Sequence, residues 1–222
     1  MRARKLVFFG VMALAFILVG ENCFADDEDF QYWSKGVIFF DINKDWRFNF
    51  EEEFRLGDDA GELYYHHLEP GCVYRGFADW LDFGFNYRQV YEKDSGGKWR
   101  EEHQPNLYFT VKDKLFGLDM TDRSRLEYRD RENKKDVWRY RNKLTLKLPF
   151  EFTALKLQPY AADEVFFTVS DDNIDKNRLY GGLFFTLSKG IKGEVYYLWQ
   201  TSRTNDKWTG INVLGSALRI NF

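Results

Sequence analysis

Hydrophobic and polar residues alternate along most of the chain with a period of two. In the segment Trp46–Leu56, large apolar side chains occupy every second position except that of Glu52, and Arg, Asn or Glu fill the positions between them. The segment Leu81–Tyr91 repeats this arrangement, with mostly Leu, Phe and Tyr on one side. A helix would spread the charged residues around its axis, whereas a strand separates them onto two faces. The pattern therefore predicts amphipathic β-strands.

Eleven such segments are readable, and they indicate an all-β, antiparallel, up-and-down barrel that spans a membrane. Short turns such as Pro149–Thr153 alternate with longer polar loops such as Glu92–Gln104, the rhythm of a bacterial outer-membrane barrel with its short turns in the periplasm. Such barrels have an even number of strands, so we expect 10–12 strands, with one strand missed or the first segment outside the membrane. The segments are Trp33–Asn43, Trp46–Leu56, Glu62–Arg75, Leu81–Tyr91, Asn106–Lys112, Leu118–Arg131, Val137–Leu148, Ala154–Val169, Arg178–Leu187, Ile191–Thr201 and Trp208–Phe222.

The first 25 residues have the composition of a secretory signal peptide. Three basic residues lie among the first five, the apolar run Leu6–Val19 follows, and Cys23-Phe24-Ala25 offers a cleavage site before Asp26. A retained membrane anchor is the alternative, but the run is shorter than the ~20 residues that a spanning helix needs. We therefore divide the chain into a signal peptide, residues 1–25, and an outer-membrane barrel, residues 26–222.

The composition of the mature chain limits which binding partners and which covalent cross-links are expected. Removing the signal peptide takes away three cations and one anion, which moves the net charge from −3 to −5, so nucleic acid is not an expected partner. Cys72 is then the only cysteine, and no internal disulfide is possible. The mean hydropathy of −0.53 is compatible with a barrel, because half of each strand faces a polar interior.

The last segment ends with apolar residues at alternate positions, including Leu218, Ile220 and the terminal Phe222. This ending resembles the signal by which the barrel assembly machinery recognises its clients, a final strand whose apolar side meets lipid and whose edge closes the barrel. We expect the cell outer membrane as the location. The expected partners are periplasmic chaperones and the assembly machinery during biogenesis, then outer-membrane lipid and lipopolysaccharide. The pattern leaves the oligomeric state open.

Several blocks of sequence occur together as a set, and as a set they resemble the bacterial family of outer-membrane barrels known as domain of unknown function 2490. The likeness runs from about Trp33 to Phe222. It implies the fold and the location, and it implies no particular activity. The blocks are Asp79-Trp80-Leu81-Asp82-Phe83-Gly84, Tyr87-Arg88 with Tyr91-Glu92-Lys93, Ser124-Arg125-Leu126-Glu127-Tyr128-Arg129, Trp138-Arg139-Tyr140-Arg141-Asn142-Lys143, Gln158-Pro159-Tyr160 with Asp163-Glu164, Asn177-Arg178-Leu179-Tyr180-Gly181-Gly182 and Tyr196-Tyr197-Leu198-Trp199-Gln200.

The hairpin around Glu132–Asp136 is basic on one face and largely aromatic or aliphatic on the other, so its basic face is predicted to line the lumen. One interpretation is a narrow channel for small anions, because rows of arginine select anions. The other is charge pairing across the lumen, which suits arginine–carboxylate forks and gives a non-conducting structural or assembly-related barrel. The basic residues are Arg123, Arg125, Arg129, Arg131, Arg139, Arg141, Lys143 and Lys147, and the available counter-charges are Glu51, Glu53, Asp82, Glu127, Glu164 and Glu194.

No catalytic residues, cofactor or metal are expected. The histidines His66, His67 and His103 lie near no Ser in sequence, and no nucleophile motif is present. Acidic residues between positions 171 and 175 do not follow the calcium-binding EF-hand pattern. An outer-membrane lipid-modifying enzyme is therefore only a third alternative.

Six polar residues fall on the predicted lipid-facing side, where a charge costs a few kcal/mol at mid-bilayer and less near the interfaces. Protruding strands, bulges that reverse the facing, or a covering partner would each explain them. These residues are Glu52, Gln89, Asp122, Ser124, Asn142 and Asp163.

Overall fold

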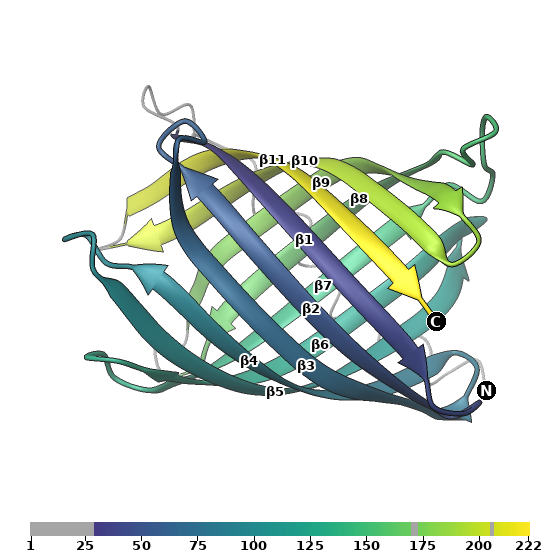
Figure 1. Cartoon of the computed structure of the whole chain (residues 1–222), viewed down its shortest axis with the longest axis horizontal. Coiled ribbons are helices and arrows are strands. Elements are labelled where there is room, and N and C mark those ends of the chain that lie inside the picture. Colours follow the sequence, from purple (N-terminus) through teal and green to yellow (C-terminus); the bar gives the residue numbers. More distant parts are fainter. Residues whose placement is uncertain (1–28, 170–172, 205–206) are drawn as a thin grey trace.

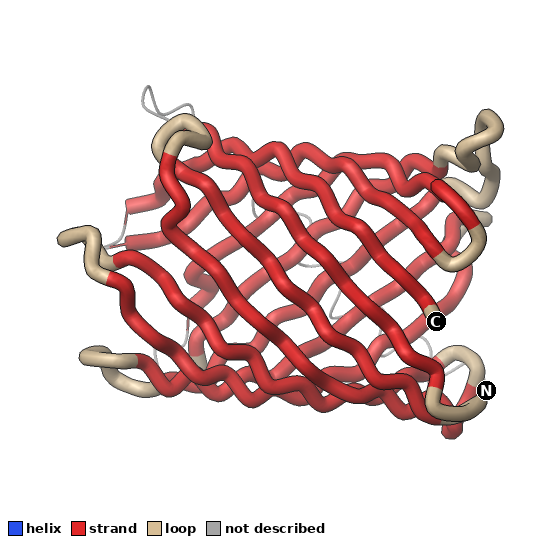
Figure 2. The backbone as a smooth tube through the Cα atoms, viewed as in Figure 1, coloured by secondary structure: helices blue, strands red, loops and turns tan. Residues whose placement is uncertain are grey.

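A computed structural model describes residues 29–169, 173–204 and 207–222, which form a single closed barrel of eleven tilted strands (Figure 1). Every regular element in this part of the chain is a strand (Figure 2). No helix found there is long and apolar enough to cross a membrane. The strands are β1 (Asp29–Asp41), β2 (Trp46–Gly57), β3 (Glu62–Ala78), β4 (Leu81–Lys93), β5 (Trp99–Leu115), β6 (Leu118–Arg131), β7 (Val137–Lys147), β8 (Gln158–Thr168), β9 (Asn173–Ser188), β10 (Ile191–Thr204) and β11 (Lys207–Asn221).

The predicted all-β barrel is confirmed, but the expectation of an even strand number is wrong. Each strand pairs with its sequence neighbour in antiparallel fashion, and the barrel closes between β1 and β11. Because eleven is odd, these two strands run in the same direction and pair in parallel, from Asp29 opposite Ile211 to Phe39 opposite Asn221 (Figure 1). The N-terminal segment, the least regular in sequence, forms β1 and completes the wall.

The two ends of the barrel differ in their connections. We call the end that carries Phe222 the C-terminal rim; the turns at residues 42–45, 79–80 and 116–117 lie there with the connections 148–157 and 189–190. The turns at 58–61, 94–98 and 132–136 lie at the other end, which we call the opposite rim.

The predicted alternation of short turns and long loops is wrong in two places. The segment Glu92–Gln104 is mostly strand around a turn in which Gly97 adopts a positive φ of 75°. Its charged residues made it resemble a loop, but several of them, including Lys93, Arg100 and Glu102, form ion pairs. The short turn predicted at Pro149–Thr153 is part of a connection from 148 to 157, which is closed by a bridge between Phe152 and Leu157.

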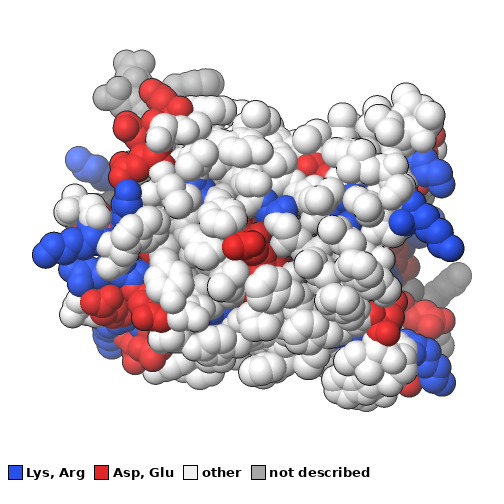
Figure 3. Space-filling view, viewed as in Figure 1, with Lys and Arg blue, Asp and Glu red and all other residues white. Residues whose placement is uncertain are grey.

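The barrel wall has an apolar outside and a mixed inside. Phe83, Phe85 and Leu107 are exposed on the outer face of β4 and β5, and lysine, arginine and acidic side chains gather at the two ends of the molecule (Figure 3). Inside, β1, β8, β10 and β11 contribute a buried apolar cluster of Trp33, Tyr160, Ala162, Tyr196, Leu198 and Val213. The remainder of the interior is polar and charged, and that part contains the predicted site residues.

Candidate functional site in the barrel interior

The predicted basic residues of β6 and β7 point into the barrel. Arg125, Arg139 and Arg141 are buried, whereas their sequence neighbours Leu126 and Trp138 are exposed on the outer face. The strands pair directly, so that Arg125 lies opposite Arg141, and Arg123 lies opposite Lys143. The predicted facing of this hairpin therefore agrees with the burial of its side chains.

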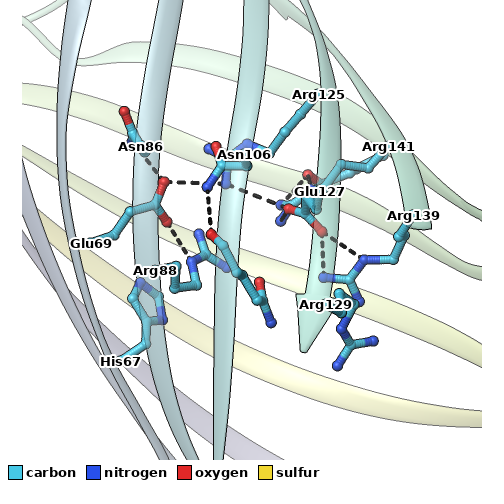
Figure 4. A network of polar contacts seen from close by, with 12 residues as sticks. His67, Glu69, Asn86, Arg88, Asn106, Arg125, Glu127, Arg129, Arg139 and Arg141 are labelled. Atoms are coloured by element: carbon cyan, nitrogen blue, oxygen red, sulfur yellow. Dashed lines mark hydrogen bonds and ion pairs between the residues drawn. The ribbon is translucent and has the colours of Figure 1, made fainter. Parts of the chain in front are cut away.

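Glu127 is at the centre of an ion-pair network (Figure 4). Its side chain is fully buried, and it accepts hydrogen bonds from Arg139 Nε at 2.7 Å and from Arg141 Nη1 at 3.1 Å. Arg141 also donates to Glu164, with 3.0 Å between Nε and Oε1. One guanidinium thus bridges carboxylates of β6 and β8, in the forked geometry that makes arginine–carboxylate pairs strong.

A second centre, which the sequence did not reveal, lies on β3 and β4. Glu69 is 1% exposed and accepts hydrogen bonds from Arg88 Nε and, at 2.6 Å, from Asn86 Nδ2. Arg125 joins the two centres, because its Nη1 lies 3.3 Å from Glu69 Oε1 and 3.6 Å from Glu127 Oε1 (Figure 4). The run Leu63–Arg75 breaks strict alternation with paired Tyr and His residues, so its facing could not be assigned from sequence.

The remaining predicted residues are distributed along the interior and its rims. Glu53 lies 2.8 Å from Lys35 and Glu51 lies 3.3 Å from it, measured between Nζ and the nearest carboxylate oxygen. Arg129 Nη2 donates to Glu102 at 2.7 Å. Other predicted residues have contacts elsewhere: Asp82 pairs with Lys112, and Glu194 with Arg219 and Tyr160. Arg131 donates to the Lys135 carbonyl at the opposite rim, and Lys147 lies over the Phe184 ring.

Four guanidinium groups border two cavities in the barrel interior. A cavity of about 320 Å³ extends toward the C-terminal rim, and one of about 80 Å³ lies toward the opposite rim. Both cavities are lined by Arg55, Arg88, Arg141 and Arg178, which we call the arginine layer. The same four side chains border both spaces, so the arginine layer lies where the two cavities adjoin.

Aromatic rings and carboxylates hold the arginine layer in place. The guanidinium carbon of Arg55 lies 3.8 Å from the centroid of the Trp33 ring, and that of Arg178 lies 4.8 Å from it. Arg141 and Arg178 both lie 4.8 Å from the centroid of Phe166. Cation–π contacts of this kind gain strength when they are desolvated, and ion pairs to Glu69 and Glu164 neutralise part of the charge.

The family profile described as Protein of unknown function (DUF2490) matches residues 30–210. The chain belongs to this family. The match covers most of the barrel and confirms the resemblance seen in the sequence blocks. No curated protein matches the chain.

The outer face of this DUF2490 barrel accounts for the polar residues that the strand pattern left unexplained. Asn142 Nδ2 donates to Asp122 Oδ1 at 2.7 Å and to Ser124 Oγ at 3.1 Å. The three other polar residues on the outer face, Asp163, Glu52 and Gln89, follow the same rule, since each has a partner on an adjacent strand. Asn177 donates to Asp163 at 2.7 Å, His66 Nε2 lies 3.2 Å from Glu52 Oε1, and Gln89 donates to Glu101.

One group of interior residues in the DUF2490 barrel has the composition of a metal site. Potential ligand atoms of Glu51, His67 and Glu69 all lie within 4.8 Å of one another. Lys35 and Arg88 already bind these carboxylates, so a metal ion would have to displace two cations. The absence of a metal remains a prediction, as does the absence of a catalytic centre.

At the opposite rim, Arg100 is held between two acidic residues. Its Nε donates to Asp94 Oδ2 at 2.8 Å, and its Nη1 donates to Glu132 Oε1 at 3.0 Å. The hydrogen bond from Arg100, followed by those from the backbone of Lys98 and Gly96, holds the pKa of Asp94 below its ordinary value. The backbone N–H of Glu101, followed by Arg100, lowers the pKa of Glu132.

Proposed function

We propose that the mature chain is an outer-membrane barrel closed by its own ion pairs, with a structural or assembly-related role rather than that of an open pore. One observation carries this proposal: the arginine layer borders both interior cavities. The buried arginines that pair with Glu69, Glu127 and Glu164 resist rearrangement, because removing one partner from a buried ion pair costs about 3–5 kcal/mol.

The positions of the tryptophans support a place in the membrane. Trp46 begins β2, Trp99 begins β5, and Trp138 and Trp208 are the second residues of β7 and β11. Trp80 directly precedes β4, and all five side chains are exposed. Exposed tryptophan at both ends of an apolar outer wall is the arrangement of the aromatic girdles that border the hydrocarbon region.

Conductance of the purified barrel in a planar bilayer tests closure. We expect no steady current through the native protein. A variant lacking two cations and two anions of the network, Glu69→Ala, Arg88→Ala, Glu127→Ala and Arg141→Ala, should conduct. The matched control removes one exposed charge of each sign at the opposite rim, Glu132→Ala and Lys134→Ala, and should stay closed. Steady current through the native barrel would refute the proposal.

Fractionation and surface labelling test the location. In a Cys72→Ser background, Lys134→Cys at the opposite rim should react with a membrane-impermeant maleimide on intact cells, and Lys189→Cys at the C-terminal rim should not. The mature protein should begin near Asp26. Recovery of the protein as a soluble periplasmic species would overturn the membrane assignment.

A narrow anion channel is the second candidate, because the larger cavity has more cationic than acidic residues in its wall. Under a salt gradient, a channel of this kind would show a reversal potential of anion preference. Replacing Arg139 and Arg141 together by Glu would reduce or invert that preference.

A further inference from the structure

The larger cavity has a strong excess of positive charge. Ten lysines and arginines line it, against the four carboxylates Glu51, Glu53, Glu164 and Glu194. These carboxylates are already engaged: Lys35 binds Glu51 and Glu53, Arg141 binds Glu164, and Arg219 binds Glu194. Several cations of the wall therefore have no carboxylate left to pair with.

Two of these cations lie directly opposite each other on neighbouring strands. Arg123 and Lys143 form a cross-strand pair of like charge, an arrangement that normally destabilises a sheet. Within the described chain, neither forms an ion pair. Arg123 lies 5.8 Å from the Tyr108 ring centroid, and Lys143 Nζ lies 3.6 Å above that of Tyr180.

Buried donors in the same wall also lack acceptors. Arg125 is 5% exposed, and its Nε and Nη1 are buried without a hydrogen-bond acceptor. The 3.3 Å approach of Nη1 to Glu69 is an ion-pair contact rather than a hydrogen bond. Arg219 Nη1 is likewise buried without a hydrogen-bond acceptor. Unsatisfied charged donors are costly in a protein interior, so Arg125 and Arg219, which both line the larger cavity, favour a further acceptor there.

We propose that the larger cavity binds a small anion carrying two or more acidic groups, phosphate or carboxylate, held between Arg123, Lys143 and Arg125. The volume of about 320 Å³ falls in the range of small-ligand sites. An arginine guanidinium binds a phosphate or carboxylate with two parallel N–H donors, and a lysine ammonium adds a compact positive charge beside it. The inference rests on the proposed function in one respect: if the interior is closed, the cavity ends at the arginine layer.

Calorimetric titration of the folded mature barrel in non-ionic detergent, at low ionic strength, tests the site. The probes are pyrophosphate for the phosphate arm, trigalacturonate for the carboxylate arm and maltotriose as the neutral comparison. We expect saturable binding of at least one anion and none of maltotriose. The double variant Arg123→Gln with Lys143→Gln should bind at least tenfold more weakly. The control Lys134→Gln with Lys135→Gln makes the same charge change at the opposite rim and should bind like the native protein.

A second variant tests the same site without removing wall charges. Thr145 lines the cavity two residues from Lys143, and Thr145→Glu places a carboxylate among the unpaired cations. We expect it to raise the thermal unfolding temperature of the ligand-free barrel and to abolish anion binding. Heat-modifiable migration on a gel verifies that each variant is folded.

Two results would overturn the inference. One is a folded native barrel that binds neither pyrophosphate nor trigalacturonate. The other is an equal loss of affinity in the Lys134 and Lys135 control, which would assign the binding to general surface charge. Either result leaves a non-conducting barrel intact, whereas current through the native barrel would refute closure whatever the titration shows.

Discussion

At the scale of single residues, the interior is organised around carboxylates that each serve several cations. Glu127 lies within 4.0 Å of Arg125, Arg139 and Arg141, and Glu69 lies within that distance of Arg88 and Arg125. Because the cations outnumber the acids here, loss of Glu127 leaves Arg139 without its carboxylate and removes one of the two carboxylates near each of Arg125 and Arg141. The acids are therefore the sensitive positions.

Glu127→Gln should destabilise the barrel by about 3–5 kcal/mol, the usual result of removing one partner of a buried pair. Adding Arg139→Gln should restore part of that loss, since the two residues are hydrogen-bonded and their effects are coupled. Urea unfolding of the barrel in vesicles, followed by tryptophan fluorescence, measures both changes. Full additivity of the two substitutions would show that the pair acts independently.

The Arg100 cluster at the opposite rim should respond to acid. The pKa of Asp94 and that of Glu132 are lowered in the folded state. The stabilisation that these two ionised carboxylates give the turns of the opposite rim is therefore fully present above the ordinary carboxyl pKa. It is lost as the pH falls through the lowered folded values. Carbon-13 titration of the two carboxyl groups, compared with that in Arg100→Gln, measures the shift. Equal titration in both proteins would contradict the assigned cause.

At the scale of elements, glycine makes room for aromatic rings inside the wall. A Cβ on Gly215 of β11 would lie 2.0 Å from Tyr196 Cζ on β10, whereas a Cβ on Gly36 of β1 would meet nothing within 4 Å. Both glycines lie in the strands that close the barrel. The same substitution at these sites therefore separates packing from general effects of backbone flexibility.

Gly215→Ala should destabilise the barrel by about 1–3 kcal/mol through overpacking, and Gly36→Ala should be neutral or slightly stabilising. Adding Tyr196→Leu to Gly215→Ala should recover part of the loss. Thermal unfolding monitored by circular dichroism compares the four proteins. Equal destabilisation at both glycines would exclude the ring contact as the cause.

Strand identity could be predicted from sequence because alternation is a local property, and it holds in segments such as Trp46–Leu56. The facing of Arg125 and Arg141 followed from the same pattern. The role of Glu69 did not, because its partners Arg88 and Arg125 come from β4 and β6, and cross-strand proximity depends on register. Register is not encoded in the alternation of one strand alone.

At the scale of the whole molecule, the last residue joins two elements. Phe222 stacks on Phe40 with ring centroids 5.1 Å apart, and its backbone N–H donates to the Phe39 carbonyl at 3.0 Å. Its side chain is also largely exposed at the C-terminal rim. Phe222 therefore contacts β1 while most of its ring stays accessible at the rim.

Phe222→Asp should reduce assembly in cells while leaving synthesis and export intact, because it places a charge at this apolar edge. The fraction of heat-modifiable protein in the outer membrane is the measurement. Phe222→Tyr is the conservative control and should assemble normally. Unchanged abundance of folded Phe222→Asp would show that the terminal ring is not a recognition element.

The parallel closure between β1 and β11 has a kinetic consequence. The other ten strand pairings join neighbours along the chain, whereas this one brings residues 29–39 beside residues 211–221. Joining distant segments carries the largest loop-closure entropy and slows folding, while hairpins form locally and fast. The cylinder should therefore form as a curved sheet whose free edges meet last. The same edges should part first on heating, so hydrogen exchange at β1 and β11 should outpace that at β5 and β6.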